Sequence, residues 1–564
     1  MKLTRRSFLI GSAAATATAV IGIPDTVAHK QRIAAAPAGN PLNIPTVING
    51  GSLTVSTSAA SILSGAQTQV LSINGAFPAP TIRITKGDTF SAHILNGISD
   101  DVVLHWHGLH VPSEMDGHPK YAIKTGTSTD ITFPVINRAG TYFYHAHTDM
   151  KTGEQVYRGL AGCFIVDDPL ENVLNLPQGE YDVPLLLSDK RFDSNNQLTY
   201  SLSDNDTMNG YLGDHMMVNG TDNAYLEVAP TRYRFRIVNA SNARTYKLAF
   251  DDNSEFTIIA TDGGLIKEPV KTTSCFLAPA ERIEIVVNFF GYFTGSILTL
   301  KSLSFFVDET PPPSPVPAHG AEFSIIRFIV SKTDVNSAAV PDKLSVYEIY
   351  NENNVVQTRS FRLGNDGMMH TINDKTFSMD RIDETIQFNQ LEKWTFDNSF
   401  TTHLHPMHVH GTQFQVLRRS SGALLPNDLG WKDTVFVQSG EQVEVLIKFA
   451  DYGGLYLVHC HNLEHEDHGM MSNIKIEGAP DSVSESQQEA TLHVYPNPAS
   501  TRTTITLEQG SSNTISLFDL AGKELERHQV VPGATSFELQ VSHIATGTYI
   551  IACGARRALI RIIR

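Results

Sequence analysis

The run His459-Cys460-His461, followed by His465 and Met470, constrains this chain more than any other part of its sequence. In an extended strand, successive side chains point to opposite faces. Cys460 would therefore project to one face of such a strand, whereas His459 and His461 would project to the other. A single strand with this pattern can supply ligands to two separate metal sites.

One of these sites has the composition of a blue-copper electron-transfer site. Such a site consists of one thiolate, two imidazoles and a weak axial thioether. Cys460, His465 and Met470 supply three of these four groups. The second imidazole must come from elsewhere, and His405, at the start of another histidine-rich segment, is the candidate.

Histidine pairs with one residue between them include four at His105 and His107, His145 and His147, His408 and His410, and His459 and His461. Their surroundings favour extended segments, so both histidines of a pair should share one face. A single pair in a chain with 22 histidines is more often a packing or surface feature. Four pairs, with an embedded cysteine and an offset methionine, instead predict a copper cluster that can bind O2.

In order and spacing, these residues resemble those of the multicopper oxidases, the family of laccases, bilirubin oxidases and periplasmic cuprous oxidases. The resemblance covers residues 45 to 478 and includes further segments at Asn74-Gly75, Pro80-Thr81-Ile82-Arg83, Gly213 to Gly220, Asn239 to Arg244 and Gly430 to Thr434. It implies an all-β chain with three cupredoxin-like Greek-key β-sandwich domains.

The resemblance also implies roles for the ligand residues, with four coppers per chain. A type 1 copper would be held by His405, Cys460 and His465, with Met470 in the axial position. A type 2 copper would take His105 and His408, and two type 3 coppers would take His107, His145, His147, His410, His459 and His461. In this family, electrons pass from the type 1 site through the cysteine to the trinuclear cluster, where O2 is reduced to water.

Reduction of O2 also consumes protons. Asp116 and Glu466 match positions that resemble the proton-relay carboxylates of the family, so both are candidate catalytic residues beside Cys460. The alternative for each is an acid on a solvated loop, which is the common environment of Asp and Glu.

Short alternating segments between Gly, Pro, Asn and Asp predict β-sandwiches, and long helical patterns are scarce. We expect sandwiches at residues 45–168, 169–332 and 333–478, the second acting as a spacer without ligands. A polar linker at 479–490 and a small C-terminal β-sandwich at 491–564 complete the expected organisation.

The N-terminus predicts export. Thr4-Arg5-Arg6-Ser7-Phe8-Leu9 and the apolar stretch after it resemble a twin-arginine signal peptide, expected at residues 1–28, with an ordinary secretory signal as the alternative. Past this segment, no apolar run approaches the length of a membrane span. The formal net charge of −16 argues against nucleic acid or anionic lipid as a partner.

The C-terminal module resembles a sorting domain of the type IX secretion system. The resemblance rests on Val494-Tyr495-Pro496-Asn497-Pro498, on the segment from Leu517 to Lys523 and on Gly547-Thr548-Tyr549. An accessory binding domain is the alternative. Together with the signal, a sorting domain implies an exported protein that passes through the periplasm to the cell surface or the medium.

The cysteines other than Cys460 form no framework. Cys163, Cys275 and Cys553 are an odd number without a characteristic spacing, and buried thiols are the expectation. A disulfide between Cys163 and Cys275 remains open.

The electron donor is the least constrained part of the function. The segments around the ligands resemble the bacterial copper-efflux oxidases, which carry a methionine-rich insertion and an acid four residues before the first type 1 histidine. This chain has no methionine between Met217 and Met368, and Thr401 stands at the acidic position. A more open type 1 edge would favour phenols or aromatic amines. Cuprous or ferrous ions, or a copper-free scaffold of this fold, are the alternatives.

Overall fold

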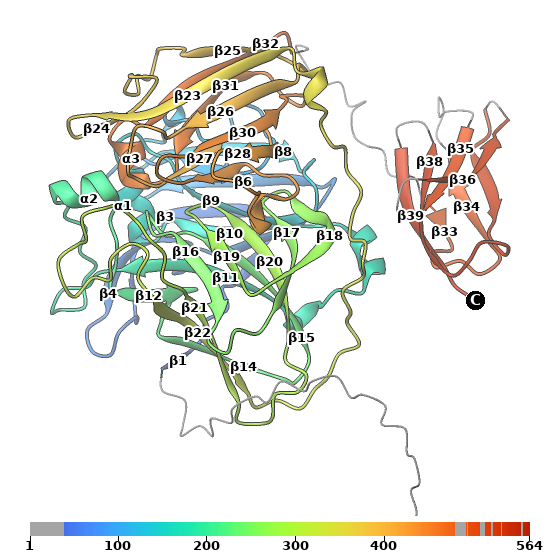
Figure 1. Cartoon of the computed structure of the whole chain (residues 1–564), viewed down its shortest axis with the longest axis horizontal. Helices are drawn as coiled ribbons and strands as arrows, with labels where there is room; N and C mark the ends of the chain where they lie inside the picture. Colours follow the sequence, from blue (N-terminus) through green and yellow to red (C-terminus); the bar gives the residue numbers. More distant parts are fainter. Residues whose placement is uncertain are drawn as a thin grey trace, which may run out of the picture.

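The computed structural model describes residues 39–479, 492, 494–507, 514–519, 523–531, 533–553 and 556–564. This part of the chain is built almost entirely of strands, as predicted (Figure 1). Its α-helices are short: α1 (Thr152–Arg158), α2 (Asp204–Asn209) and α3 (Leu463–Asp467). Within the described residues, no helix has the length and apolarity required to cross a membrane. The expected signal peptide at 1–28 and residues 480–490 of the expected linker lie outside them.

The first two-sheet unit follows the N-terminal strands. One sheet has the order β2 (Val47–Ile48), β5 (Thr81–Thr85), β10 (Ala161–Asp167), β9 (Gly140–Ala146) and β7 (Leu104–His107). The other has the order β4 (Thr68–Ile73), β3 (Gly51–Ala60), β6 (Thr89–Asn96) and β8 (Ser128–Pro134). Alternate residues of β6 are buried, because only one of its faces packs on the core.

The second unit contains the largest sheets. One has the order β1 (Asn40–Pro41), β14 (Ala224–Val228), β22 (Phe323–Val330), β21 (Ile297–Ser302), β16 (Tyr246–Phe250) and β19 (Ser274–Leu277). The other has the order β13 (Thr221–Asp222), β12 (His215–Val218), β11 (Asp182–Lys190), β15 (Arg232–Asn239), β20 (Arg282–Asn288), β17 (Phe256–Thr261) and β18 (Gly264–Thr272).

The third unit again pairs two sheets. One has the order β24 (Met369–Ile372), β23 (Gln357–Asp366), β26 (Glu392–Asp397), β30 (Gln442–Ile447) and β28 (Phe414–Arg419). The other has the order β25 (Glu384–Gln387), β32 (Met471–Glu477), β31 (Gly454–Cys460), β27 (His405–Val409) and β29 (Thr434–Val437).

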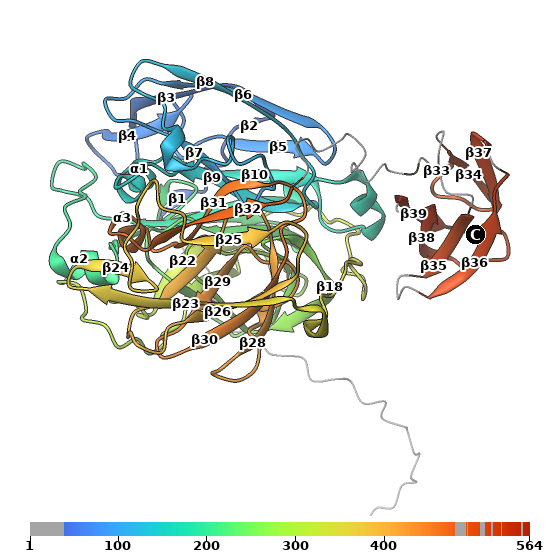
Figure 2. The ribbon, with the colours of Figure 1, turned by 90° about the horizontal axis from the view of Figure 1, so that it is seen from above.

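The C-terminal unit consists of two small sheets (Figure 2). Their orders are β33 (Val494–Tyr495), β34 (Arg502–Thr506), β37 (Ser536–Gln540), and β36 (Glu524–Gln529), β35 (Thr514–Asp519), β38 (Gly547–Cys553), β39 (Arg556–Ile562). Its apolar core includes Ile505, Leu517 and Ile551 and shares no residue with the cores of the other three units. The unit therefore has the apolar core that an independently folded domain requires.

The strands that carry the histidine pairs lie at the centre of the larger body. Every residue of β7, β9 and β27 is buried, and β31 is buried from Tyr456 onward. Both faces of these strands are therefore covered by protein, including the faces that carry histidines. Their polar side chains must therefore find partners inside the protein.

Cys163 and Cys275 are both buried free thiols. The disulfide between them that the sequence left open is not formed. Burial raises the pKa of each thiol, which is the behaviour of packing residues rather than reactive ones.

Candidate metal centres

Strand register brings the histidine pairs together. In the first sandwich, β7 and β9 run antiparallel with His105 opposite His145. In the third sandwich, β27 and β31 run antiparallel with His408 opposite His459 and Met407 opposite Cys460. Cys460 consequently faces the core of the third sandwich, while its neighbour His459 faces the histidines of the first.

The eight paired histidines form one pair and two triples. Nε2 of His105 lies 3.3 Å from Nε2 of His408. Nε2 of His459 lies 3.3 Å from Nε2 of His147 and 3.0 Å from that of His410. Nε2 of His145 lies 3.3 Å from Nε2 of His461 and 3.4 Å from Nδ1 of His107. This grouping matches the division into one type 2 and two type 3 ligand sets.

The donor set suits metal ions. Two nitrogens that bind one tetrahedral metal ion at about 2.0 Å lie about 3.3 Å apart, which agrees with the separations above. Burial lowers the pKa of all the paired histidines for which a shift is resolved, to about 4 for His145 and about 3 for His147. Neutral imidazoles offer the free lone pairs that metal binding requires.

The predicted type 1 residues form a separate cluster on the other face of β31. Sγ of Cys460 lies 3.5 Å from Nδ1 of His405 and 3.7 Å from Nδ1 of His465, and these two nitrogens lie 3.3 Å apart. Met470 is buried in the same apolar core and accepts a backbone hydrogen bond from Cys460. Burial raises the pKa of the Cys460 thiol, so a cation is needed to hold it as a thiolate.

The outer edge of this cluster is covered, which differs from the open edge expected from the sequence. Both imidazoles are fully buried. His465 hydrogen-bonds through Nε2 to the carbonyl oxygen of Met208 in α2 at 2.9 Å, and Nε2 of His405 lies 3.2 Å from Oγ1 of Thr401. The cover comes from a short helix of the second sandwich, which no pattern near the ligands indicates.

Two further histidines surround the same cluster and were not singled out by the sequence. The ring of His370 stacks on that of His465, with centroids 3.8 Å apart, and its Nε2 donates a hydrogen bond to the carbonyl oxygen of Thr207 at 3.1 Å. His403 lies next to both type 1 candidates and contacts Oδ1 of Asn209 through Nδ1 at 3.1 Å. His370 belongs to no spaced pair. His403 stands two positions before His405 but was not among the four pairs singled out, and the tertiary structure places both residues beside the cluster.

Asp116 reaches the histidine cluster directly. Its Oδ2 accepts a hydrogen bond of 2.6 Å from Nδ1 of His410, and its backbone carbonyl accepts one of 2.5 Å from Nδ1 of His105. Its Oδ1 is buried without a hydrogen-bond partner. Burial raises the pKa of Asp116 well above its usual value.

Glu466 contacts the same triple of histidines as Asp116, but its pKa is shifted in the opposite direction. Its Oε2 lies 3.1 Å from Nδ1 of His459, and its Oε1 lies 3.6 Å from Nε2 of His147. Burial raises the pKa of this carboxyl, but the two histidines outweigh burial and hold the pKa at about 2. Two carboxyls with pKa values moved in opposite directions are a common arrangement of acid and base groups at a catalytic site.

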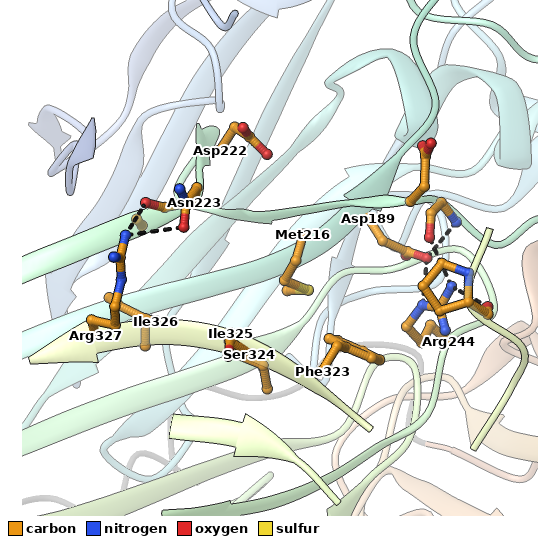
Figure 3. A pocket seen from close by; sticks show the side chains of 14 residues that line it. Asp189, Met216, Asp222, Asn223, Arg244, Phe323, Ser324, Ile325, Ile326 and Arg327 are labelled. Carbon is orange, nitrogen blue, oxygen red and sulfur yellow. Dashed lines mark hydrogen bonds and ion pairs between the residues drawn. The ribbon is translucent and has the colours of Figure 1, made fainter. Parts of the chain in front are cut away.

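A cavity of about 220 Å³ lies in the second sandwich (Figure 3). Asp189 lines it, and its Oδ2 accepts hydrogen bonds from the backbone N–H of Gly213 at 2.6 Å and from Nε of Arg244 at 2.7 Å. Met216 and Phe323 form part of its apolar wall. None of the candidate ligands or acids lines this cavity, so it is separate from the metal centres.

Models of protein families match most of the chain. Three models described as "Multicopper oxidase" match residues 54–171, 182–292 and 340–479. A fourth, described as "Secretion system C-terminal sorting domain", matches residues 493–560.

Known proteins show the same likeness. A laccase of Bacillus subtilis is 32% identical over 72% of this chain and 90% of its own length. The Escherichia coli cell division protein FtsP is 30% identical over 85% of this chain and all of its own. The crystal structure of the McoA multicopper oxidase of Aquifex aeolicus is similar with a TM-score of 0.72 and 36% identity, over 78% of this chain and 100% of that one.

Proposed function

Because this chain belongs to the multicopper oxidase family and ends in a secretion sorting domain, we propose that it is an exported oxidase that couples one-electron oxidation of a donor to the four-electron reduction of O2 to water. One observation carries the proposal. Cys460 faces the predicted type 1 cluster, while its neighbours His459 and His461 face the eight-histidine cluster.

The proposed copper ligands follow this geometry. His405, Cys460 and His465 would hold the type 1 copper with Met470 as its axial ligand, and His105 and His408 would hold the type 2 copper. The two type 3 coppers would be held by His107, His145 and His461, and by His147, His410 and His459. Copper in these positions supplies one-electron redox chemistry and an O2-binding centre.

The protein contributes placement, exclusion of water and control of protons. The candidate ligands are at most 3% exposed, so their geometry is fixed by packing on both sandwiches. In β31, Cys460 of the type 1 cluster directly follows His459 of the eight-histidine cluster, so the backbone offers electrons a short covalent route. Asp116 and Glu466 would deliver and accept protons at the triple of His147, His410 and His459.

For the donor, we propose phenols or aromatic amines. The similarity to a laccase supports this class, and the closed edge above His465 means that the electron would pass through the α2 segment rather than by contact of the donor with the ring. A cuprous or ferrous ion is the second candidate, because Asp204 in the first turn of α2 is exposed and Met208 of the same helix is partly exposed. Carboxylates and a thioether can attract and bind such ions.

Oxygen uptake by the copper-loaded protein tests the function. We expect O2 consumption with a small phenol such as 2,6-dimethoxyphenol, and metal analysis should give one type 1, one type 2 and two type 3 coppers per chain. Cu(I) and Fe(II), assayed in parallel, decide between the donor classes. Negligible uptake with all three donors, or markedly fewer coppers, would show that the chain has lost the oxidase activity. This outcome is worth testing because one relative, FtsP, is named as a cell division protein and not as an oxidase.

The role of Asp116 is tested by Asp116→Asn. We expect the blue absorption to remain, because Asp116 contacts His410 and His105 but no type 1 candidate. O2 turnover should fall by about a hundredfold, the usual contribution of a general acid.

Glu114→Gln is the matched control, since Glu114 is an exposed acid of the same loop that hydrogen-bonds Ser113. It should leave turnover unchanged. Equal turnover in Asp116→Asn and the unsubstituted protein would remove Asp116 from the proton path.

A further inference from the structure

One imidazole of the cluster is oriented differently from the rest. His147, His410, His459, His145 and His461 approach their neighbours through Nε2. His107 instead approaches His145 through Nδ1, at 3.4 Å. Its Nε2 points away from the cluster and therefore needs a partner of its own.

That partner is Asp433. Nε2 of His107 lies 3.0 Å from Oδ1 of Asp433 and 3.1 Å from Oγ1 of Thr434. A carboxylate can only accept a hydrogen bond, so Nε2 must carry the proton and Nδ1 the free lone pair. The contact therefore selects the tautomer of His107 in which Nδ1 faces the other histidines.

Asp433 is itself held by Arg282 of the second sandwich. Nη1 of Arg282 donates to Oδ1 of Asp433 at 2.6 Å and Nη2 donates to Oδ2, so the pair is bidentate. Both side chains are completely buried. Nε of Arg282 also donates to the carbonyl of Thr141 in β9 at 3.1 Å. His107, Arg282 and Asp433 come from the first, second and third sandwiches respectively.

The close approach of these groups is built into the backbone. Gly108, directly after His107, has φ +82°, and a Cβ at this position would clash with Oδ2 of Asp433 and Nη2 of Arg282. A residue with a side chain would be strained here and would displace the carboxylate. Glycine thus lets Asp433 reach the ring of His107.

The network extends beyond this pair. It contains the carboxyls of Asp262 and Glu281 and the ammonium of Lys432, whose Nζ lies 3.0 Å from both. Oδ2 of Asp262 also accepts hydrogen bonds of 3.3 Å from the backbone N–H groups of Asp433 and Thr434, which fixes the backbone that carries the Asp433 carboxylate.

We infer that Asp433, clamped by Arg282, is a positioning residue that fixes the tautomer and ring direction of His107 for the type 3 copper. The second sandwich then takes part in building the oxygen site rather than serving only as a spacer. This inference rests on the proposed assignment of His107 as a copper ligand.

The test compares Asp433→Asn with a matched control, Asp428→Asn. Asp428 is also buried in the third sandwich and bidentate to an arginine, Arg419, but it contacts no histidine. Both substitutions should lower the unfolding temperature. Only Asp433→Asn should weaken type 3 copper binding, by about ten- to a hundredfold, and lower the near-ultraviolet type 3 absorption while the blue band remains.

Arg282→Lys provides a second route if Asp433→Asn does not fold, because it keeps the charge but removes the two-pronged contact with Asp433. We expect an intermediate loss of type 3 absorption, again with an unchanged blue band. Full type 3 copper and absorption in the folded variants would overturn the inference. Lack of copper in the unsubstituted protein would instead overturn the proposed function, so the two failures are distinguishable.

Discussion

Cys460→Ser should abolish both the blue absorption and the consumption of O2. The colour of such a site arises from the copper–thiolate bond, which a serine hydroxyl does not replace. Electrons would also lose the route from the type 1 cluster into His459 and His461, because Cys460 joins the two clusters. We expect O2 uptake to fall to background with every donor, measured together with the visible spectrum and the copper content.

Cys275→Ser is the control for this experiment. Cys275 is an equally buried thiol, but it lies in the core of the second sandwich and is part of no histidine cluster. The Cys275→Ser variant should fold normally and keep both the blue absorption and the activity. Survival of colour and turnover in Cys460→Ser would refute the assignment of the type 1 site.

Deletion of residues 490–564 should trap active oxidase in the periplasm. This segment carries the match to a secretion sorting domain, and its apolar core is separate from the cores of the oxidase body. We therefore expect the shortened protein to fold, bind copper and oxidise its donor, but to be absent from the cell surface and medium. Fractionation followed by an activity assay of each fraction measures the effect.

Full-length Cys460→Ser completes the design of the secretion experiment. It keeps the sorting domain and should leave the cell although it is inactive, which separates export from catalysis. Secretion of the shortened protein at the normal level would contradict the sorting role and favour an accessory binding domain.

The parts of the site that follow from local periodicity could be predicted from the sequence. Alternation along a strand places Cys460 and His459 on opposite faces, and the same rule places the members of each histidine pair on one face. The all-β fold followed from short strand patterns and turn residues, and the structure confirms it.

Contacts between sandwiches could not be predicted in the same way. Met208 caps His465 from a helix more than 250 positions earlier in the chain, and no periodicity relates the two residues. Arg282 lies 151 positions from Asp433, in a strand without any ligand. Asp433 belonged to a segment that resembles the family, but its contact with His107 required the tertiary structure.

The eight-histidine cluster receives four imidazoles from each of two sandwiches, His105, His107, His145 and His147 from the first and His408, His410, His459 and His461 from the third. Any ion bound between them also cross-links the two sandwiches. Because binding and stability are linked, any change that makes ion binding more favourable makes the association of the two domains more favourable by the same free energy. In the metal-free chain, we therefore expect the interface between the first and third sandwiches to open before either sandwich unfolds.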